Sequence, residues 1–419
     1  MKTALSLLAV VVAAAACSGG TDNTTSTERV NDPSHVDAPY VVMISFDGFR
    51  WDYQDRFATP NFDRVAEAGV RAESMIPVFP SKTFPTHYSI ATGMYAENHG
   101  LVGNRFWAPE RQTTYQMSDR TTVEDGSWYG GEPIWVTAER QGMVSASYFF
   151  VGSEADVGGV RPTYWHPFDG SVPNNDRVDA ALQWLNMPPE SRPHMITLYF
   201  SDVDDAGHQF GPDSEEVETA VASVDLSLGR LLDGLEALPH GDDVHVVLVS
   251  DHGMMLASTD NVDVLDMDLF PGVMLAEAGP YASLHIQEGG LERGPGLRDS
   301  IQALMPQNQV YLREDVPERL HYSSNPRVGD IVIVVAAGRT VSTPDRVPTS
   351  DFYTHGWDNA TPEMGAIFLA KGARIQPGVT VPAFESVHVY PLLAEILGLT
   401  ANPDIDGDLQ VLSGVLTGR

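Results

Sequence analysis

The chain has 419 residues, of which 42% are hydrophobic and 20% are charged, a balance typical of a globular enzyme with a sizeable core. Its 57 acidic and 25 basic residues give a formal net charge of −32. A charge of this sign repels polymeric nucleic acid and excludes a broad DNA- or RNA-binding role. A small anionic substrate is still allowed, because bound divalent metal ions would reverse the sign of the local field.

The first 17 residues have the pattern of an export signal. Lys2 is followed by an apolar stretch, residues 5–16, that is too short to cross a bilayer as a helix. Small residues precede Cys17, as in the lipobox at which bacterial lipoproteins are processed and lipidated. Ala14 stands where a leucine is usual, so an ordinary cleaved secretion signal is the alternative. We therefore expect a periplasmic or cell-surface protein, lipid-anchored at Cys17, or otherwise a secreted one.

Residues 18–38 are rich in Ser, Thr, Asn and Asp, and this composition predicts a flexible tether. Cys17 is the only cysteine of the chain, so no intrachain disulfide can form. We expect one catalytic domain over residues 39–419, whose stability comes from its core and from bound metal ions.

Three continuous apolar runs, residues 40–46, 195–200 and 244–250, are typical of strands buried on both faces of a parallel sheet. Acidic or imidazole side chains follow each run closely. In open α/β sheets, ligands bind outside the carboxyl ends of the strands. The pattern therefore predicts a polar site at this edge of the sheet.

The clearest helix is predicted over residues 214–238, where Asp213 and Glu216 have the spacing of a capping box. Alternating strands and helices indicate an α/β core with a mostly parallel central sheet flanked by helices. The stretch from about 270 to 345 is less regular. A strand-like run at 330–335 and a helical pattern at 297–304 indicate a small α+β insertion.

Aspartate, histidine and threonine side chains recur at the predicted edge of the sheet, and aspartate and histidine are suitable zinc ligands. They occur at these positions: Asp47, Thr83, Asp204, His208, Asp251, His252 and His355. One such residue at the end of a strand is more often a cap or a turn residue. Several of them, following separate buried runs, favour a metal site.

The sequence resembles the nucleotide pyrophosphatase/phosphodiesterases of the alkaline phosphatase superfamily, in their bacterial type, over roughly residues 40–410. The matching blocks are SFDG at 45–48, FPSKTFP at 79–85, ATGMY at 91–95, NHGLVGN at 98–104, GEPIW at 131–135, DDAGH at 204–208, SDHGM at 250–254 and HGWDN at 355–359. The resemblance implies an alkaline-phosphatase-like core.

The resemblance also implies two zinc ions and their ligands. Asp47, Thr83, Asp251 and His252 would hold the first ion. Asp204, His208 and His355 would hold the second, with Asp204 and His208 on one loop that the intervening glycine lets turn inward. Manganese or iron could also occupy an Asp/His site. His87 and His99 lie near Thr83 but match no ligand position of the family, so we expect them to pack or to support the ligands.

Thr83 is implied as the nucleophile, since coordination to zinc lowers the pKa of a hydroxyl and makes it reactive. Pro85 predicts a helix that begins near Thr83, and the free backbone donors of a helix start favour phosphate oxygens. Asn104 matches a family asparagine that binds a phosphate oxygen. The expected reaction is an in-line displacement through a covalent intermediate on Thr83.

Two aromatic residues bear on the choice of substrate. Phe84 follows the nucleophile, and Phe168 matches a position whose aromatic ring stacks on a nucleobase in nucleotide-cleaving relatives. We therefore expect small phosphate diesters, in particular nucleotides, as substrates, with release of a nucleoside 5′-monophosphate. A phosphomonoesterase of the same superfamily, a choline- or glycerol-type phosphodiesterase and an inactive binding protein are the alternatives.

Overall fold

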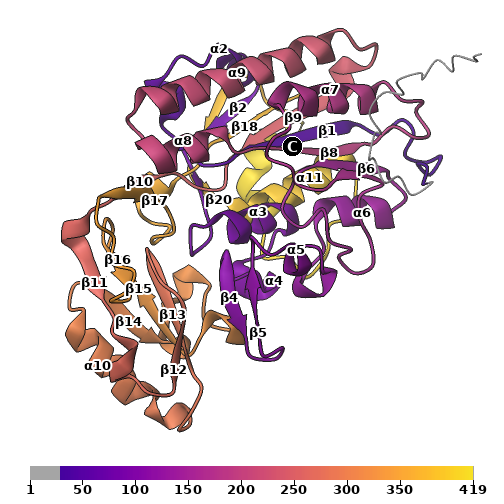
Figure 1. Ribbon diagram of the computed structural model, residues 1–419. Helices are drawn as coiled ribbons and strands as arrows, with labels where there is room; N and C mark the ends of the chain where they lie inside the picture. Colours follow the sequence, from indigo (N-terminus) through magenta and orange to yellow (C-terminus); the bar gives the residue numbers. More distant parts are fainter. Residues whose placement is uncertain (1–28, 419) are drawn as a thin grey trace, which may run out of the picture.

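The computed structural model describes residues 29–418, and its centre is an eight-stranded sheet in the order β19-β2-β18-β9-β1-β8-β6-β7 (Figure 1). The strands are β1 (Tyr40–Phe46), β2 (Val70–Ala72), β6 (Ser145–Tyr148), β7 (Tyr164–His166), β8 (Met195–Phe200), β9 (Val244–Val249), β18 (Phe368–Lys371) and β19 (Val379–Val381). Only β18 runs against its neighbours in this sheet. The predicted α/β fold with a mostly parallel central sheet is therefore confirmed.

Strand β1 lies in the middle of the sheet, and every one of its residues is buried. It pairs in parallel with β8 and β9, with Ile44 opposite both Leu198 and Leu248. Successive side chains of a strand point to opposite faces, so Val41 contributes to one hydrophobic core and Val42 to the other. This explains why the run is apolar without alternation.

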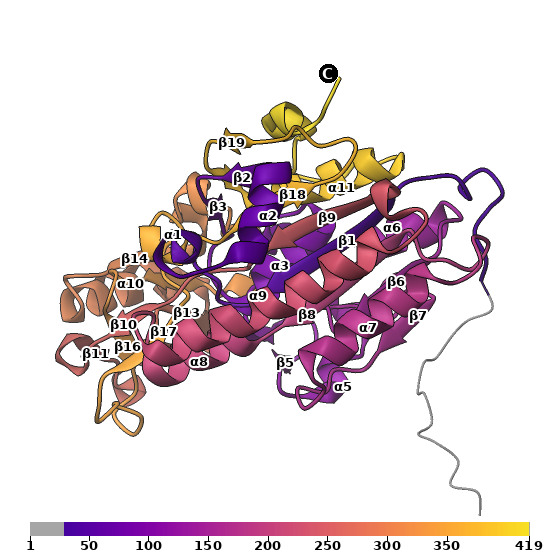
Figure 2. The same cartoon turned by 90° about the horizontal axis from the view of Figure 1, so that it is seen from above.

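Helices cover both faces of the sheet, as Figure 2 shows from above. One face carries α2 (Pro60–Ala68), α7 (Asn174–Leu185) and α9 (Glu215–Glu236). The other carries α3 (Thr83–Thr92), α6 (Ile134–Arg140) and α11 (Val389–Leu397). The apolar faces of these helices complete the two cores, so the polar edge of the sheet between them rests on a rigid support.

The predicted cap of α9 is wrong by one residue. Ser214, and not Asp213, precedes the helix, and its Oγ accepts a hydrogen bond from the backbone N–H of Val217 at 3.2 Å. Asp213 instead forms an ion pair with Arg56. Both residues are good N-caps, and the nearby guanidinium distinguishes them only in the folded chain.

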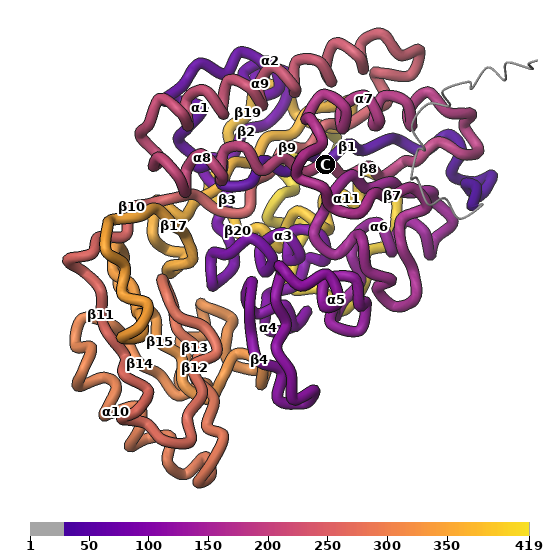
Figure 3. The backbone as a smooth tube through the Cα atoms, viewed as in Figure 1, coloured from indigo at the N-terminus to yellow at the C-terminus, as the bar shows by residue number. Residues whose placement is uncertain are grey.

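A second sheet is antiparallel throughout, in the order β12-β13-β15-β14. Its strands are β12 (Val273–Glu277), β13 (Tyr281–Ile286), β14 (Gln309–Leu312) and β15 (Ile331–Val334), and α10 (Gly294–Leu304) packs against β14. The tube in Figure 3 shows this part beside the main body. The antiparallel pair β10 (Met255–Ala257) and β17 (Phe352–Thr354) lies between the two.

Short elements complete the fold. They are α1 (Tyr53–Arg56), α4 (Ala96–His99), α5 (Arg120–Val123), α8 (Asp202–Phe210), β3 (Met75–Ile76), β4 (Arg105–Ala108), β5 (Thr113–Gln116), β11 (Val262–Val264), β16 (Thr340–Ser342) and β20 (Phe384–Glu385). Trp357 is fully buried and belongs to the core of the second sheet, together with Ile331 and Ile333. The segment that contains His355 is therefore supported by that core.

Residues 29–38 fall in the predicted tether but are held against the folded body. The side chain of Asn31 is buried and donates to the carbonyl oxygens of Pro189 and Arg192, at 2.9 and 2.8 Å. This part of the segment is therefore not a tether, because its buried amide makes good hydrogen bonds with the domain. The predicted signal segment and Cys17 lie outside the described residues. Within residues 29–418, no helix is long and apolar enough to cross a bilayer.

Candidate active site

The carboxyl ends of β1 and β9 deliver three polar side chains to one place. Asp47 directly follows β1, and Asp251 and His252 follow β9 after one residue. The Nε2 atom of His252 lies 3.5 Å from Oδ1 of Asp47 and 2.9 Å from Oδ2 of Asp251. All three residues are buried. Adjacent parallel strands thus bring together residues about 200 positions apart in the chain.

Thr83 is the first residue of α3, and its Oγ1 lies 3.3 Å from Nε2 of His252. The helix begins here after the extended Lys82, and Pro85 falls in the first turn, where its missing N–H costs no hydrogen bond. Asn104 lies beside the start of the helix, because its Oδ1 accepts from the backbone N–H of Phe84 at 2.9 Å. This bond orients the amide and leaves its NH₂ group to donate.

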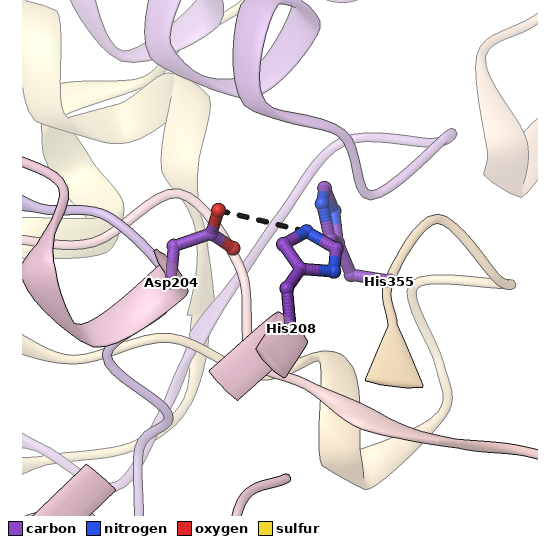
Figure 4. Close-up of side chains that lie close together, drawn as sticks. All are labelled: Asp204, His208 and His355. Atoms are coloured by element: carbon purple, nitrogen blue, oxygen red, sulfur yellow. Dashed lines mark ion pairs between the residues drawn. The ribbon is translucent and has the colours of Figure 1, made fainter. Parts of the chain in front are cut away.

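Asp204 and His208 lie on helix α8, and this corrects the predicted loop. They are four residues apart on one face of the helix, with Oδ2 of Asp204 3.5 Å from Nε2 of His208. Gly207 between them packs closely against Met254, since a β-carbon there would lie 3.1 Å from the end of that side chain. His355 follows β17 and points into the same space (Figure 4).

The three histidines share one hydrogen-bonding pattern. Nδ1 of each faces a backbone carbonyl oxygen: His208 that of Tyr353 at 2.7 Å, His252 that of Gly253 at 3.0 Å, and His355 that of Ser81 at 2.8 Å. An N–H at Nδ1 that donates to a carbonyl leaves the lone pair on Nε2. Burial and the neighbouring His252 hold the pKa of His355 well below its usual value. A neutral ring of this kind is suited to bind a metal ion.

Each buried carboxylate keeps one oxygen to which no residue among 29–418 donates a hydrogen bond. These oxygens are Oδ1 of Asp47, Oδ1 of Asp204 and Oδ2 of Asp251, the last of which faces the imidazoles of His252 and His87. Burial and the nearby Asp251 and Asp204 raise the pKa of Asp47 well above its usual value. Burial also opposes ionisation of Asp251, but the imidazoles of His252 and His87 hold its pKa well below the usual value. Unpaired carboxylates that crowd together fit a site built around a cation.

Groups of three ligand atoms, each within 4.8 Å of one another, could hold a metal ion in this region. They are Asp204 with His208 and His355, Asp47 with Asp204 and His252, and Asp47 with His87 and Asp251. The donor chemistry of all three groups fits a divalent transition metal. The group of Asp204, His208 and His355 is the trio that the resemblance implied for the second ion, and the other two groups overlap with the set implied for the first.

His87 was expected to pack or to support the ligands, and its contacts agree with the supporting role. Its Nε2 lies 2.7 Å from Oγ of Ser45, and its Nδ1 lies 2.9 Å from the carbonyl oxygen of Thr83 and 3.3 Å from Oδ2 of Asp251. Both nitrogens therefore have partners within the chain. His99 is buried away from these residues, with Nε2 2.9 Å from Oγ of Ser89.

A cavity of about 420 Å³ opens beside the carboxylates and Thr83. Its lining includes Phe84 and Phe168, the two aromatic residues proposed from the sequence to contact the substrate, together with Phe149, Tyr199 and Arg120. A larger groove of about 750 Å³ lies around Trp51 and Arg319, away from these residues. The chemistry of the side chains, and not the size of the hollow, marks the smaller cavity as the candidate site.

Sequence reasoning missed two supporting features of the site. The hydroxyl of Tyr199 donates to Oδ2 of Asp47 at 2.6 Å, and Glu154 at the cavity is paired with Arg120. Tyr199 lies within an apolar run, so the sequence alone predicts an ordinary aromatic residue of the core at this position. Arg120 and Glu154 are 34 positions apart, and nothing in their spacing indicates that they pair. The apolar-run pattern placed the strand of Tyr199 but could not show the direction of its hydroxyl.

A family model described as type I phosphodiesterase / nucleotide pyrophosphatase matches residues 41–358. The chain belongs to this family. The match spans most of the chain and includes the segments of Asp47, Thr83, Asp204 and His355. The expected resemblance is thereby confirmed, and with it membership of a family of phosphoric diester hydrolases.

Among curated relatives, ectonucleotide pyrophosphatase/phosphodiesterase family member 1 of Homo sapiens is 32% identical over 90% of this chain and 42% of its own length. This chain thus spans less than half of that relative. An uncharacterized pyrophosphatase/phosphodiesterase of Schizosaccharomyces pombe is 35% identical over 89% of this chain and 80% of its own length. Murine ectonucleotide pyrophosphatase/phosphodiesterase 5, solved as an inactive variant with AMP, superposes with a TM-score of 0.84 at 32% identity, covering 90% of this chain and all of that one.

Proposed function

We propose that the chain is a two-zinc phosphodiesterase and nucleotide pyrophosphatase that releases nucleoside 5′-monophosphates. The observation that supports this most directly is the set of three histidine Nε2 atoms, turned by backbone hydrogen bonds toward buried carboxylates with a threonine hydroxyl beside them. One oxygen of each of these carboxylates has no hydrogen-bond partner in the described part of the chain. The proposed ligands of one ion are Asp47, Thr83, Asp251 and His252, and those of the other are Asp204, His208 and His355. When bound, the ions would lower the pKa of the hydroxyl and neutralise phosphate charge.

The residues of the chain then have distinct roles. The oxygen of Thr83 attacks phosphorus in line with the leaving oxygen, so a bond to Thr83 forms as the bond to the leaving group breaks. Attack by water on the same phosphorus releases the product and restores the hydroxyl. The NH₂ group of Asn104, oriented by its bond to the backbone of Phe84, donates to a nonbridging oxygen of the substrate. The covalent step divides the displacement into two easier ones.

The aromatic cavity favours a nucleotide over other diesters. Phe84 and Phe168 both line it, and stacking on aromatic side chains is worth about 1–3 kcal/mol per base. The solved relative with AMP is described as a nucleotide complex, which supports the same class of ligand here. Preferred hydrolysis of monoesters, or of glycerophosphocholine-like diesters, would instead favour one of the alternatives named above.

We also propose that the protein acts outside the cytoplasm, in the periplasm or at the cell surface. The amino-terminal signal pattern supports export, and the Cys17 motif supports a lipid anchor. Relatives that are named as ectoenzymes or as a venom phosphodiesterase of Crotalus durissus collilineatus fit an exported enzyme. Mass spectrometry of the mature amino terminus would distinguish a lipidated Cys17 from a plain cleavage product.

The central experiment combines metal analysis with a substrate panel. Purified protein should contain about two zinc ions per chain, and it should hydrolyse p-nitrophenyl thymidine monophosphate far faster than p-nitrophenyl phosphate. Thr83→Ala should abolish turnover and retain the metal, while Thr83→Ser should keep part of the activity because it keeps the hydroxyl. Acid quenching during turnover should trap a nucleotidyl adduct on the peptide that contains Thr83. Full activity of Thr83→Ala would refute the nucleophile assignment.

A further inference from the structure

The position of Phe168 at the mouth of the cavity is fixed by a buried carboxylate. The ring is 46% exposed, and its ring contacts are with the rings of Phe149, at 5.4 Å between centroids, and Tyr199, at 6.1 Å. Its backbone N–H, however, donates to Oε2 of Glu154 at 3.0 Å. Glu154 is itself only 5% exposed. An exposed ring on a loop is thus tied to the rigid body through its own main chain.

Arg120 holds the same carboxylate through two hydrogen bonds. Its Nη1 donates to Oε1 of Glu154 at 3.1 Å, and its Nη2 donates to Oε2. Bidentate guanidinium–carboxylate pairs are stronger and more directional than neutral hydrogen bonds. The main-chain carbonyl of Glu154 also accepts from Nε of Arg161 at 2.9 Å. Glu154 is therefore fixed at its carboxylate and at its backbone, and both Arg120 and Glu154 line the cavity.

We infer that Arg120 and Glu154 form a latch that positions Phe168 and thereby makes the cavity selective for diesters in which the substituent that stays on phosphorus after hydrolysis carries a planar aromatic ring. The inference rests on the proposed function and deepens it. Among the hydrogen bonds of the described residues, none links Arg120 or Glu154 to Thr83, whose Oγ1 faces His252 instead. Arg120 and Glu154 instead affect binding of the substituent that stays on phosphorus. If the ring of Phe168 is already held in place, it loses less conformational freedom when a base stacks on it.

Glu154→Gln is the sharpest test of the latch. Oε2 of Glu154 accepts from both the Phe168 N–H and Nη2 of Arg120, while Oε1 accepts from Nη1 of Arg120. A glutamine of the same shape offers only one acceptor oxygen, so its NH₂ group must face a guanidinium N–H in either orientation. The variant should therefore break the bidentate pair and loosen the hold on the Phe168 N–H, with little change in volume.

Two substrates with the same leaving group separate positioning from chemistry. For p-nitrophenyl thymidine monophosphate, KM of Glu154→Gln should rise about tenfold, within the range expected for loss of one base-stacking contact, while kcat changes less than twofold. For methyl p-nitrophenyl phosphate, which retains only a methyl group, both constants should stay within twofold of wild type. Equal losses on both substrates would overturn the inference.

Glu124→Gln is the matched control. Glu124 accepts from the same Arg120 at 2.8 Å, but its side chain is 51% exposed. No hydrogen bond links it to Phe168 among the described residues, so this variant should behave as wild type on both substrates. Arg120→Lys keeps the charge but loses the bidentate geometry. It should raise KM for the thymidine ester by less than Glu154→Gln does.

A double-mutant cycle completes the test. If Glu154 acts through Phe168, adding Glu154→Gln to Phe168→Ala should not raise KM for the thymidine ester further, so the two effects are strongly non-additive. Additive effects would overturn the latch. The proposed function fails in a different way, because wild-type protein would then hydrolyse neither diester. Equal melting temperatures of wild type and Glu154→Gln exclude general unfolding as the cause of a raised KM.

Discussion

Replacing Asp47 with asparagine should have opposite effects on the metal-free and the metal-loaded protein. In the metal-free protein, Asp47 is 1% exposed and lies among other carboxylates, and its Oδ1 has no partner. Burial, Asp251 and Asp204 all raise its pKa. Asparagine has nearly the same shape, can still accept the hydrogen bond of Tyr199, and carries no charge. The variant should therefore be more stable than wild type when metal is absent.

The gain in stability from Asp47→Asn has an upper limit. A buried carboxyl group can escape the cost of its charge by taking up a proton. The cost at pH 7 therefore cannot exceed the free energy of protonation from its ordinary pKa of 3.8, about 4 kcal/mol at about 1.4 kcal/mol per pH unit. The pKa of Asp47 is higher in the folded protein than in the unfolded chain. Below its pKa in the unfolded chain, the carboxyl group is protonated in both states and does not lower the stability. The loss of stability grows as the pH rises above that value, and it stops growing once the pH exceeds the pKa in the folded protein. Asp47→Asn should accordingly gain about 1–4 kcal/mol at pH 7 and little at pH 3.5.

Urea unfolding in EDTA measures the effect of Asp47→Asn on the stability of the metal-free protein. The same experiment with saturating zinc measures its effect on the metal-loaded protein. With zinc, wild type should gain stability by mass action, and Asp47→Asn should gain much less because it lacks an anionic ligand. Isothermal titration with zinc should show the same loss of affinity directly. The reasoning is refuted if Asp47→Asn destabilises the metal-free protein, or if zinc stabilises the variant as strongly as it stabilises wild type.

Three further changes test other parts of the site and the fold. Tyr199→Phe removes the hydroxyl that orients Asp47 and should weaken zinc binding about 10–100-fold without unfolding the protein, as titration calorimetry would show. Gly48→Ala places a β-carbon 2.8 Å from the backbone of Asp204 at a φ of +70°, so urea unfolding should show a loss of roughly 1–3 kcal/mol and activity should fall; wild-type stability would contradict this. His285 is buried, and burial lowers its pKa to about 4. Above pH 6.5 the imidazole is neutral in both the folded and the unfolded chain, and the stability is not reduced. As the pH falls toward 4, the unfolded chain takes up a proton before the folded one does, and stability is lost. His285→Gln should therefore lose less stability than wild type between pH 6.5 and 4, by up to about 3 kcal/mol.

The sequence predicted the parts of the fold that depend on burial. Continuous apolar runs identify β1 and β8 with their observed bounds, and β9 to within a residue, because only strands covered on both faces need apolar side chains at every position. The convergence of Asp47 with Asp251 follows from the same reasoning, since the strands that precede them are parallel neighbours.

Features that depend on tertiary contact could not be predicted in this way. Residues 202–210 contain aspartates and a glycine, which are poor helix formers, so the local sequence favours a loop over the helix that carries Asp204 and His208. In the folded chain, α8 packs against α9 and β17, and Gly207 fits against Met254. Packing overrides propensity here, and the i, i+4 spacing on a helix replaces the predicted turn. The pairing of Arg120 with Glu154 likewise exists only after folding.

The distribution of charge in the cavity bears on the choice between a diester and a monoester. Among the described residues, Arg120 is the only basic side chain that lines the cavity, and Glu154 and Glu124 already neutralise its guanidinium. The lining itself, within residues 29–418, therefore offers no unpaired cation with which to balance a second phosphate charge. The charge of the substrate must be met by ions held among the aspartates and histidines, and a diester with a single negative charge places the smaller demand on them. A monoester would add a second negative charge beside Asp47 and Asp204, and this favours the diesterase proposal over the monoesterase alternative.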